Sequence, residues 1–220
     1  AIDGTCARSA QFTVLDWPIR ELAGRTLGVV GWGVLGQTAA RACENALGMT
    51  VLVANRAGAA PQPGRVDLHD LLPQVDVLTL HCPLISETRG LIDARALSLM
   101  QPHAVLVNTS RGPVVDEPAL VAALQSGRIA GAALDVFLEE PPVGSPLLSM
   151  PNVVVSPHNG GLSDVSVAEM TRRCAETVVA VARGGVAADL VNRRSLATHP
   201  DPTIRQRLLP DRLLPEGSTT

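Results

Sequence analysis

Three glycines at fixed spacing form the first pattern in this sequence that could do chemistry. They lie in Gly31-Trp32-Gly33-Val34-Leu35-Gly36, a G-x-G-x-x-G motif directly after an apolar run. The first glycine permits a tight turn, the second lets a pyrophosphate approach the backbone, and the third lets a helix pack closely on the strand. Glycines also mark ordinary turns, but the strand before this motif and the helix after it favour a phosphate cradle. We therefore expect Gly31, Gly33 and Gly36 to hold a dinucleotide, with the backbone N–H groups of Val34 and Leu35 facing its phosphates.

The end of the next apolar run carries Asn55 and Arg56. About twenty residues after such a motif, an acidic residue normally binds the ribose hydroxyls of the adenosine. No acid stands here. Asn55 can still form a hydrogen bond with the ribose, and Arg56 could pair with a 2′-phosphate or be a solvated surface charge. We expect NADP or NAD as the cofactor, with a modest preference for NADP.

Two residue types are absent, and their absence excludes several mechanisms. All 18 basic residues are arginines, and the chain has no tyrosine. Without lysine there is neither a Walker-type phosphate loop nor a Schiff base, and short-chain dehydrogenases need a tyrosine and a lysine together. An acid or base in this chain must therefore come from His, Asp, Glu or Cys.

The elements that position these residues follow an alternating pattern. Strands are expected at residues 26–30, 50–54, 76–80, 104–108, 131–135 and 152–156. Helices are expected at residues 34–47, 118–125 and 163–183, with a less regular one at 94–100. Most of the strands are nearly continuously apolar, as parallel strands covered by helices on both faces are. The pattern predicts the α/β class, with a doubly wound parallel sheet joined by right-handed crossovers.

The domain limits are predicted from composition and periodicity. Residues 22–194 are expected to form the dinucleotide-binding domain. Residues 1–21 are interpreted as a remnant of an interdomain or lid segment, because they contain no strand of this sheet and begin without a methionine. Residues 195–220 mix Pro, Arg, Ser and Thr without periodicity, so we expect a disordered tail. The chain is thus expected to be a fragment that lacks most of a second domain.

Composition limits the partners. The net charge is -3, and no basic run precedes the tail, so we expect no nucleic acid as a partner. No apolar run approaches the roughly 20 residues that cross a bilayer, and no signal peptide is evident, so a soluble, cytoplasmic protein without membrane contact is expected. The four cysteines are widely spaced and form no C-x-x-C pair, so we expect neither a disulfide framework nor a metal site.

Four further ordered motifs carry a family resemblance. They are His81-Cys82-Pro83-Leu84 with Glu87-Thr88-Arg89-Gly90, Val107-Asn108-Thr109-Ser110-Arg111-Gly112, Leu134-Asp135-Val136-Phe137 with Glu140-Pro141, and Ser156-Pro157-His158-Asn159-Gly160-Gly161. Together they resemble the D-isomer-specific 2-hydroxyacid dehydrogenases, from about residue 12 to residue 193. The segments 18–36 and 46–56 look most like the glycerate dehydrogenase and hydroxypyruvate reductase branch. The resemblance implies a Rossmann NAD(P)-binding domain.

The resemblance also implies roles for individual residues. Arg111 would hold the substrate carboxylate, Glu140 would support the catalytic histidine, and His158 would transfer the proton. Glu139 competes with Glu140, because the sequence alone does not say which side chain faces His158. Further cofactor contacts are implied at Pro83, Thr109, Ser110, Arg111, Asp135, His158, Asn159, Gly160 and Gly161. Asn159 replaces the usual apolar residue of its motif. We expect a difference in local packing but little functional consequence, because the backbone of this residue is the expected contact.

These residue types suit the reduction of a 2-keto acid. A planar guanidinium can grip a carboxylate through two parallel hydrogen bonds, and it polarises the neighbouring carbonyl. Histidine can donate a proton in reduction and accept one in oxidation, and a nearby carboxylate stabilises its charged form. Asp135 could accept a hydrogen bond from the nicotinamide carboxamide or act as a structural cap. The remaining histidines have no such context: His81 is expected to shape the cofactor side, and His69, His103 and His199 to lie on the surface.

The sequence therefore predicts an oxidoreductase that transfers a hydride between NAD(P)H and a small 2-keto or 2-hydroxy acid, such as hydroxypyruvate, glyoxylate or glycerate. The resemblance further implies a homodimer. Two alternatives remain open. One is a dinucleotide-sensing interaction protein, since transcriptional corepressors resemble the same family. The other is an inactive fragment that only binds cofactor.

Overall fold

The computed structural model describes residues 19–55, 62–186 and 200–203. The chain divides into two compact units, residues 1–160 and 161–220. The expected remnant at 1–21 and the expected tail at 195–220 lie almost entirely outside the described residues, as do Arg56 and His199.

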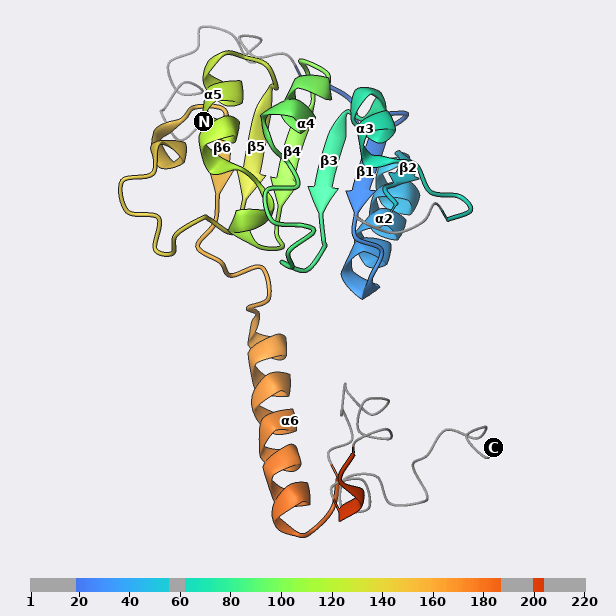
Figure 1. Ribbon diagram of the computed structural model, residues 1–220, viewed down its shortest axis with the longest axis vertical. Coiled ribbons are helices and arrows are strands. Elements are labelled where there is room, and N and C mark those ends of the chain that lie inside the picture. The colour runs from blue at the N-terminus through green and yellow to red at the C-terminus, as the bar shows by residue number, and fades with distance from the viewer. Residues whose placement is uncertain (1–18, 56–61, 187–199, 204–220) are drawn as a thin grey trace, which may run out of the picture. The chain divides into compact units, whose positions relative to one another are not determined.

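The first unit is built on six parallel strands (Figure 1). They are β1 (Thr26–Val30), β2 (Thr50–Val53), β3 (Val77–Leu80), β4 (Val105–Asn108), β5 (Gly131–Leu134) and β6 (Val153–Val155). Their order across the sheet is β2-β1-β3-β4-β5-β6. The chain therefore reverses its direction of travel between β1 and β3, and ligands of open α/β sheets bind at such a switch point, outside the carboxyl ends of the strands.

Short helices connect the strands. They are α2 (Val34–Leu47), α3 (Leu68–Leu71), α4 (Ala94–Leu99) and α5 (Glu117–Gln125), with 3₁₀ turns at Leu72–Gln74, Gly112–Val114 and Pro146–Ser149. Three of the helices begin at an aspartate whose carboxylate accepts a hydrogen bond from a first-turn N–H: Asp67, Asp93 and Asp116. Gly48 ends α2 in the left-handed conformation, which glycine adopts without steric cost.

The core lies on both faces of the sheet. On one face, Leu78, Leu80 and Leu106 pack in a large cluster with residues of α3, α4 and α5. On the other face, Leu27 and Val29 pack with Ala40 of α2 and with Met49. Because successive strand side chains point to opposite faces, neighbouring residues of β1 contribute to different clusters. Helices thus cover both faces, and the predicted α/β doubly wound sheet is confirmed.

The structure differs from the predicted elements in two ways. Helix α3 was not expected, because four residues are too few to show a helical period. At the edge of the sheet, β6 is less covered than the other strands, and Val154 is 71% exposed. The remaining predicted strands and helices are present, with ends that differ by one residue in most cases.

The second unit contains the helix α6 (Asp164–Ala182). A reciprocal pair of hydrogen bonds starts it: the Ser163 hydroxyl accepts from the Ser166 N–H at 3.0 Å, and the Ser166 hydroxyl accepts from the Ser163 N–H at 2.7 Å. Glu169 binds Arg172 and Arg173 along the exposed surface, and these hydrogen bonds lower the pKa of Glu169 to about 2.

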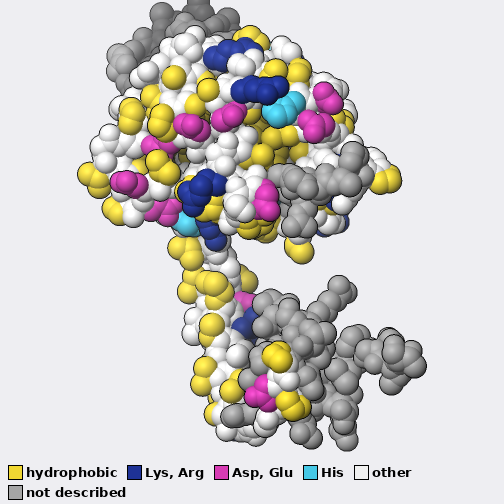
Figure 2. Space-filling view, in the orientation of Figure 1, with side chains coloured by type: hydrophobic (Ala, Val, Ile, Leu, Met, Phe, Trp, Pro, Cys, Tyr) yellow, Lys and Arg dark blue, Asp and Glu magenta, His cyan; other side chains and the backbone are white. Residues whose placement is uncertain are grey.

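Acidic and basic side chains are interspersed over the face of the first unit that Figure 2 displays. Within the described residues, no helix combines the length and the apolar character needed to cross a bilayer. The same residues contain no group of three or more histidine, cysteine or acidic side chains suited to holding a metal ion.

Candidate active site

The turn from β1 into α2 is shaped by its glycines. Gly31 has a φ of +99°, and a Cβ atom on it would lie 2.6 Å from the backbone nitrogen of Cys82. A Cβ on Gly36 would lie 2.0 Å from the carbonyl oxygen of Gly31, so the helix reaches the strand only because Gly36 has no side chain. Gly33 has open space where a Cβ would stand. Two glycines thus allow close packing, and the third leaves its backbone accessible to a ligand.

The amino end of α2 is electrostatically suited to an anion. Gly33 is its N-cap, no side chain caps the first turn, and the first turn contains no acidic residue. The helix dipole and the unsatisfied N–H groups of such an end attract phosphate. Val34 and Leu35, the two residues predicted to present these groups, are 80% and 72% exposed. The geometry fits the pyrophosphate of a dinucleotide.

A cavity of about 470 Å³ opens at the switch point of the sheet. Of the residues predicted to contact the cofactor, Gly31, Gly33, Asn55 and Pro83 line it. His81 also lines it, as expected, and burial lowers the pKa of its imidazole. Other lining residues were missed by the sequence analysis: Trp32, Gln62, Arg65, Asp67, Cys82, Ile85 and Thr88. A Pro63-Gly64 pair next to Gln62 and Arg65 was the available signal for a tight turn at this position.

The loop after β4 presents Arg111. The buried Asn108 holds this loop in place. The sequence motifs did not indicate it as a positioning residue. The Asn108 amide donates to the carbonyl oxygen of Arg111 at 3.0 Å, and its oxygen accepts from the N–H and the hydroxyl of Ser110 at 3.0 and 2.9 Å. Gly112 packs so closely that an added Cβ would lie 1.8 Å from the carbonyl oxygen of Phe137. This close approach brings the loop of Arg111 against the loop that follows β5.

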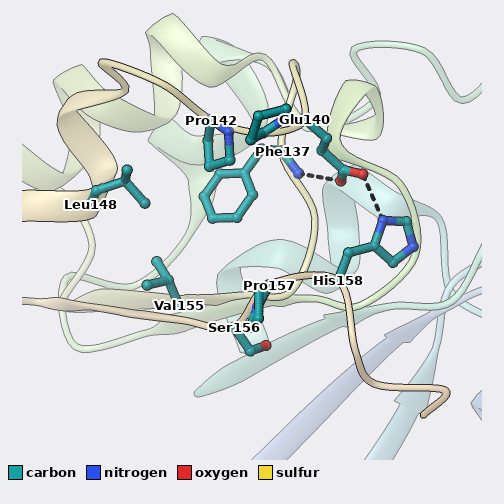
Figure 3. A pocket seen from close by; sticks show the side chains of 9 residues that line it. Phe137, Glu140, Pro142, Leu148, Val155, Ser156, Pro157 and His158 are labelled. Atoms are coloured by element: carbon teal, nitrogen blue, oxygen red, sulfur yellow. Dashed lines mark hydrogen bonds and ion pairs between the residues drawn. The ribbon is translucent and has the colours of Figure 1, made fainter.

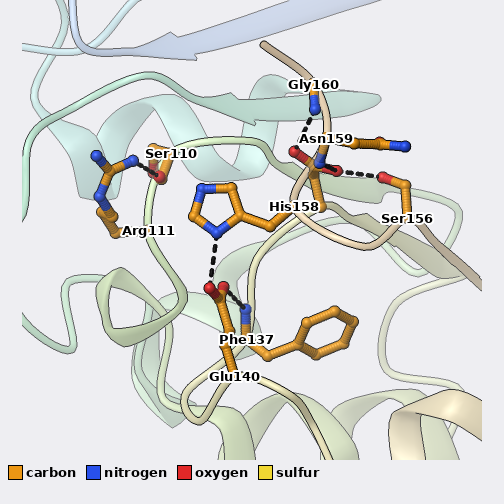
Figure 4. Close-up of polar contacts among 9 residues, drawn as sticks. Ser110, Arg111, Phe137, Glu140, Ser156, His158, Asn159 and Gly160 are labelled. Atoms are coloured by element: carbon orange, nitrogen blue, oxygen red, sulfur yellow. Dashed lines mark hydrogen bonds and ion pairs between the residues drawn. The ribbon is translucent and has the colours of Figure 1, made fainter. Parts of the chain in front are cut away.

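Glu140 and His158 form a hydrogen-bonded pair (Figure 4). The Nδ1 atom of His158 lies 2.6 Å from Oε2 of Glu140, and Oε1 of Glu140 accepts from the N–H of Phe137 at 3.0 Å. The hydrogen bond from His158 is the main reason why the pKa of Glu140 is lowered, followed by the one from Phe137, and the charge of Arg111 adds to the effect. Glu140 rather than Glu139 is therefore the glutamate that contacts the histidine.

Asp135 holds the loop that carries His158. One carboxylate oxygen accepts from the Ser156 hydroxyl at 2.5 Å and from the Asn159 N–H at 3.0 Å, and the other accepts from the Gly160 N–H at 2.9 Å. Burial alone would raise the pKa of Asp135, but these hydrogen bonds outweigh it and lower the pKa. His158 has a φ of +51°, an uncommon conformation that the loop must enforce. Within the described residues Asp135 therefore caps this loop. Its contact with the nicotinamide carboxamide stays a prediction, for which the carboxylate retains lone-pair capacity.

An apolar cavity of about 370 Å³ lies beside the histidine and the glutamate (Figure 3). Phe137, Pro142, Leu148, Val155 and Pro157 form its walls, and Glu140 and His158 border it. The cavity is thus mostly apolar, whereas the side chains of His158 and Glu140 at its border remain 48% and 36% exposed.

The other histidines and the cysteine of the predicted motifs have structural settings. His69 is exposed, as expected. The prediction that His103 is a surface residue needs correction, because its Nε2 atom lies 2.6 Å from Asp76 and its side chain is partly buried. The reason is that the segments preceding β3 and β4 are neighbours in the sheet. Cys82 is buried, which raises the pKa of its thiol and disfavours the reactive thiolate.

The fold and the site together define a dinucleotide-binding α/β domain that carries a histidine–carboxylate pair at the carboxyl edge of its sheet. Comparison with known families agrees. Residues 5–160 match the model of the D-isomer specific 2-hydroxyacid dehydrogenase, NAD binding domain, and the chain belongs to this family.

Individual relatives support the assignment. A glycerate dehydrogenase of Methylorubrum extorquens is 41% identical over 184 residues, which cover 82% of this chain and 57% of the relative. The D-lactate dehydrogenase of Lactobacillus jensenii, solved with NAD+, matches with a TM-score of 0.71 and 28% identity over 81% of this chain and 59% of its own. An acyclic imino acid reductase in complex with NADPH and D-arginine matches with a TM-score of 0.72 and 30% identity, covering 83% and 59%. The chain spans little more than half the length of these relatives.

Proposed function

We propose that this chain is the cofactor-binding and catalytic part of an NAD(P)-dependent D-2-hydroxyacid dehydrogenase. Its reaction would interconvert a small 2-keto acid and the corresponding 2-hydroxy acid, of the hydroxypyruvate, glyoxylate or glycerate type. The observation that carries the proposal is the 2.6 Å contact between His158 and Glu140, close enough to the Arg111 loop for the arginine's charge to lower the pKa of the same glutamate.

Each of the three side chains has a task in this reaction. The Arg111 guanidinium binds the substrate carboxylate and holds the adjacent carbonyl in register. Because Nδ1 of His158 faces Glu140, its Nε2 atom remains to donate a proton to the carbonyl oxygen during reduction and to accept it during oxidation. Glu140 fixes the ring orientation and stabilises the protonated imidazole. When bound, the nicotinamide supplies the hydride for the carbonyl carbon or accepts it in the reverse direction.

The residues that would hold the cofactor follow from the fit described above. Gly31, Gly33 and the amino end of α2 would bind the pyrophosphate, and Asn55 the adenosine ribose. Thr109, Ser110, Asn159, Gly160 and Gly161 are proposed to contact the nicotinamide half, as the family resemblance implies. A modest preference for NADP and a homodimeric state are also proposed, the latter on the resemblance alone.

Turnover and binding can be tested separately. Oxidation of NADPH and NADH with hydroxypyruvate is followed by absorbance, and dinucleotide binding by the fluorescence of Trp32, which lines the cofactor cavity. His158→Asn should lower the reduction rate by at least about 100-fold, since general acid–base catalysis typically contributes that much. Asparagine tolerates the positive φ, so dinucleotide binding should be retained. His69→Asn, at an exposed histidine, is the matched control.

The outcome also separates the alternative functions. Because lid closure normally positions the reactants, the assay should include the chain joined to a complete substrate domain. Dinucleotide binding without turnover in that longer protein would reject the enzyme and favour a dinucleotide-sensing interaction protein. Equal activity of the wild type and His158→Asn would reject the assigned proton donor.

A further inference from the structure

A short turn beside the carboxyl end of β2 holds an arginine that the sequence motifs did not indicate. The turn comprises Gln62, Pro63, Gly64 and Arg65, and the N–H of Arg65 donates to the carbonyl oxygen of Gln62 at 3.1 Å. Proline at the second position and glycine with a φ of +72° at the third position suit a type II turn. The turn is therefore preorganised by its own sequence.

The chain after this turn is joined to the edge of the sheet. Val66 donates to the carbonyl oxygen of Val53 at 2.9 Å, and Asn55 donates to the carbonyl oxygen of Val66 at 2.7 Å. These two bonds form a parallel bridge between Ala54 and Val66, just past the end of β2. In this parallel register Arg65 lies beside Val53 and Asp67 beside Asn55, so the bridge fixes both side chains at the end of β2. The adenosine ribose is expected at this strand end in this type of fold.

Arg65 is available for a ligand. It lines the same 470 Å³ cavity as the glycines of the phosphate cradle and Asn55. Its backbone is held by the turn and the bridge, and among the residues that the structure describes, no hydrogen bond or ion pair occupies its guanidinium. The strand end itself carries no carboxylate that would bind the two ribose hydroxyls or repel an added phosphate.

We propose that Arg65 binds the 2′-phosphate of NADP(H) and gives the site its preference for the phosphorylated dinucleotide. The inference rests on the proposed function, since it assumes that the cavity holds the adenosine half of the cofactor. Guanidinium groups bind phosphate through two parallel hydrogen bonds, which makes arginine better suited to this task than a neutral donor. Gln62, which also lines the cavity, can add a neutral donor beside the same phosphate.

An acidic residue, Asp67, lines the same cavity as Arg65 and is the alternative ligand, for the ribose hydroxyls of NAD. Its carboxylate already accepts a hydrogen bond from the His69 N–H at 2.9 Å, as the N-cap of α3. The His69 ring lies 3.7 Å from the same oxygen, and the Asp67 side chain is 67% exposed. Asp67 is thus engaged in starting a helix, whereas Arg65 is partly buried in the cavity wall. This contrast favours a phosphate over a bare ribose.

Direct binding of cofactor fragments tests the inference without relying on turnover. Calorimetry with the whole chain should give tighter binding of 2′,5′-ADP than of 5′-AMP, and of NADPH than of NADH. Arg65→Gln should weaken the binding of 2′,5′-ADP and NADPH by about 10- to 100-fold, the usual range for a lost charge-assisted hydrogen bond. The affinities for 5′-AMP and NADH should change by no more than about 2-fold, within the scatter of surface substitutions.

Controls separate the local effect from a general loss of structure or charge. Arg65→Lys keeps the positive charge but loses the planar group that forms two parallel hydrogen bonds. Its affinities for 2′,5′-ADP and NADPH should lie between those of the wild type and Arg65→Gln. Arg95→Gln, at an exposed arginine of α4, should leave all four affinities unchanged. Asn55→Asp should shift the preference toward NADH, since a carboxylate binds the ribose hydroxyls and repels the phosphate.

The two proposals fail in different ways. If NADH binds at least as tightly as NADPH, or if Arg65→Gln changes neither affinity, the inference is overturned while the dehydrogenase proposal stands. The same holds if Asp67→Asn weakens NADH binding and Arg65→Gln has no effect. If the wild-type chain binds neither dinucleotide, the proposed function fails and the inference fails with it.

Discussion

Oε2 of Glu140 lies 2.6 Å from Nδ1 of His158, and the other oxygen of the same carboxylate accepts from the Phe137 N–H. The glutamate is thus anchored to the backbone after β5 while it holds a ring from the loop after β6. Two loops that are separate in sequence meet at one carboxylate.

Replacement of Glu140 should slow catalysis more than replacement of its neighbour. Glu140→Gln keeps the shape but removes the negative charge that stabilises the protonated imidazole, so we expect the reduction rate to fall by about 10- to 100-fold. The measurement is the rate of NADPH oxidation with hydroxypyruvate by the chain joined to a substrate domain. Glu139→Gln is the matched control and should retain near wild-type activity. Equal losses for the two variants would contradict the assignment of Glu140.

Asp135 should act on His158 through the loop between them. Asp135→Asn replaces an acceptor oxygen with an NH₂ group that faces N–H donors, so we expect a loss of about 1–3 kcal/mol of unfolding free energy. Activity should fall as well, because the loop would no longer enforce the backbone conformation of His158. Urea unfolding and turnover are measured together. A variant with full activity and unchanged stability would show that the three hydrogen bonds to Asp135 do not position the histidine.

Alanine at two of the motif glycines should impair different properties, the stability of the fold in one case and dinucleotide binding in the other. Gly36→Ala places a Cβ 2.0 Å from the Gly31 carbonyl oxygen, so it should destabilise the fold by about 1–3 kcal/mol, as overpacking does. Gly33→Ala meets no protein atom within 4 Å, so the melting temperature should stay within about 2 °C. The added methyl group would stand in the path of the pyrophosphate, and dinucleotide binding should weaken by about 10-fold or more. Unfolding and binding curves for both variants decide the matter. Unchanged dinucleotide affinity of Gly33→Ala would place the phosphates elsewhere.

The sequence was sufficient for the elements that local patterns encode. Continuous apolar runs identified all six strands, and the glycine spacing identified the β1–α2 turn. Both signals depend on residues close in sequence. The sequence could not choose between Glu139 and Glu140, because the direction of each side chain depends on the path of the loop after β5.

Other features depend on contacts between distant segments. Arg65 lines the cofactor cavity because a bridge between Ala54 and Val66 holds its segment at the end of β2, and no local sequence pattern predicts this bridge. His103 was expected on the surface, but it contacts Asp76 because β3 and β4 start side by side. The cap role of Asp135 likewise requires the loop after β6 to fold back over the end of β5. Such contacts depend on the order of the strands and the paths of the loops. Local periodicity predicts only the fold class, not these details.

The ion pairs and hydrogen bonds of Asp76, at the amino edge of the sheet, should make the free energy of unfolding depend on pH in the acid range. Asp76 accepts from the Thr26 N–H at 2.8 Å, lies 2.6 Å from Nε2 of His103 and 3.1 Å from Nη1 of Arg25. Burial alone would raise the pKa of Asp76, but the Thr26 and His103 hydrogen bonds and the Arg25 charge outweigh it and lower the pKa. A lowered pKa in the folded state means that the carboxylate binds protons less readily than in the unfolded chain, whose pKa is near 3.8.

The stabilisation by Asp76 is therefore fully present above that unfolded value, and it is lost as the pH falls through the lowered folded pKa. Urea unfolding between about pH 6 and pH 2.5 should show this decline, and Asp76→Asn should flatten the curve at a cost of about 1–3 kcal/mol near neutral pH. Most of the cost should come from the Thr26 and His103 bonds, because the Arg25 side chain is 41% exposed and its ion pair is screened by solvent. Asp93→Asn, which alters only a helix cap, is the control and should retain the acid dependence. An unaltered pH profile in Asp76→Asn would assign the acid sensitivity to other carboxylates.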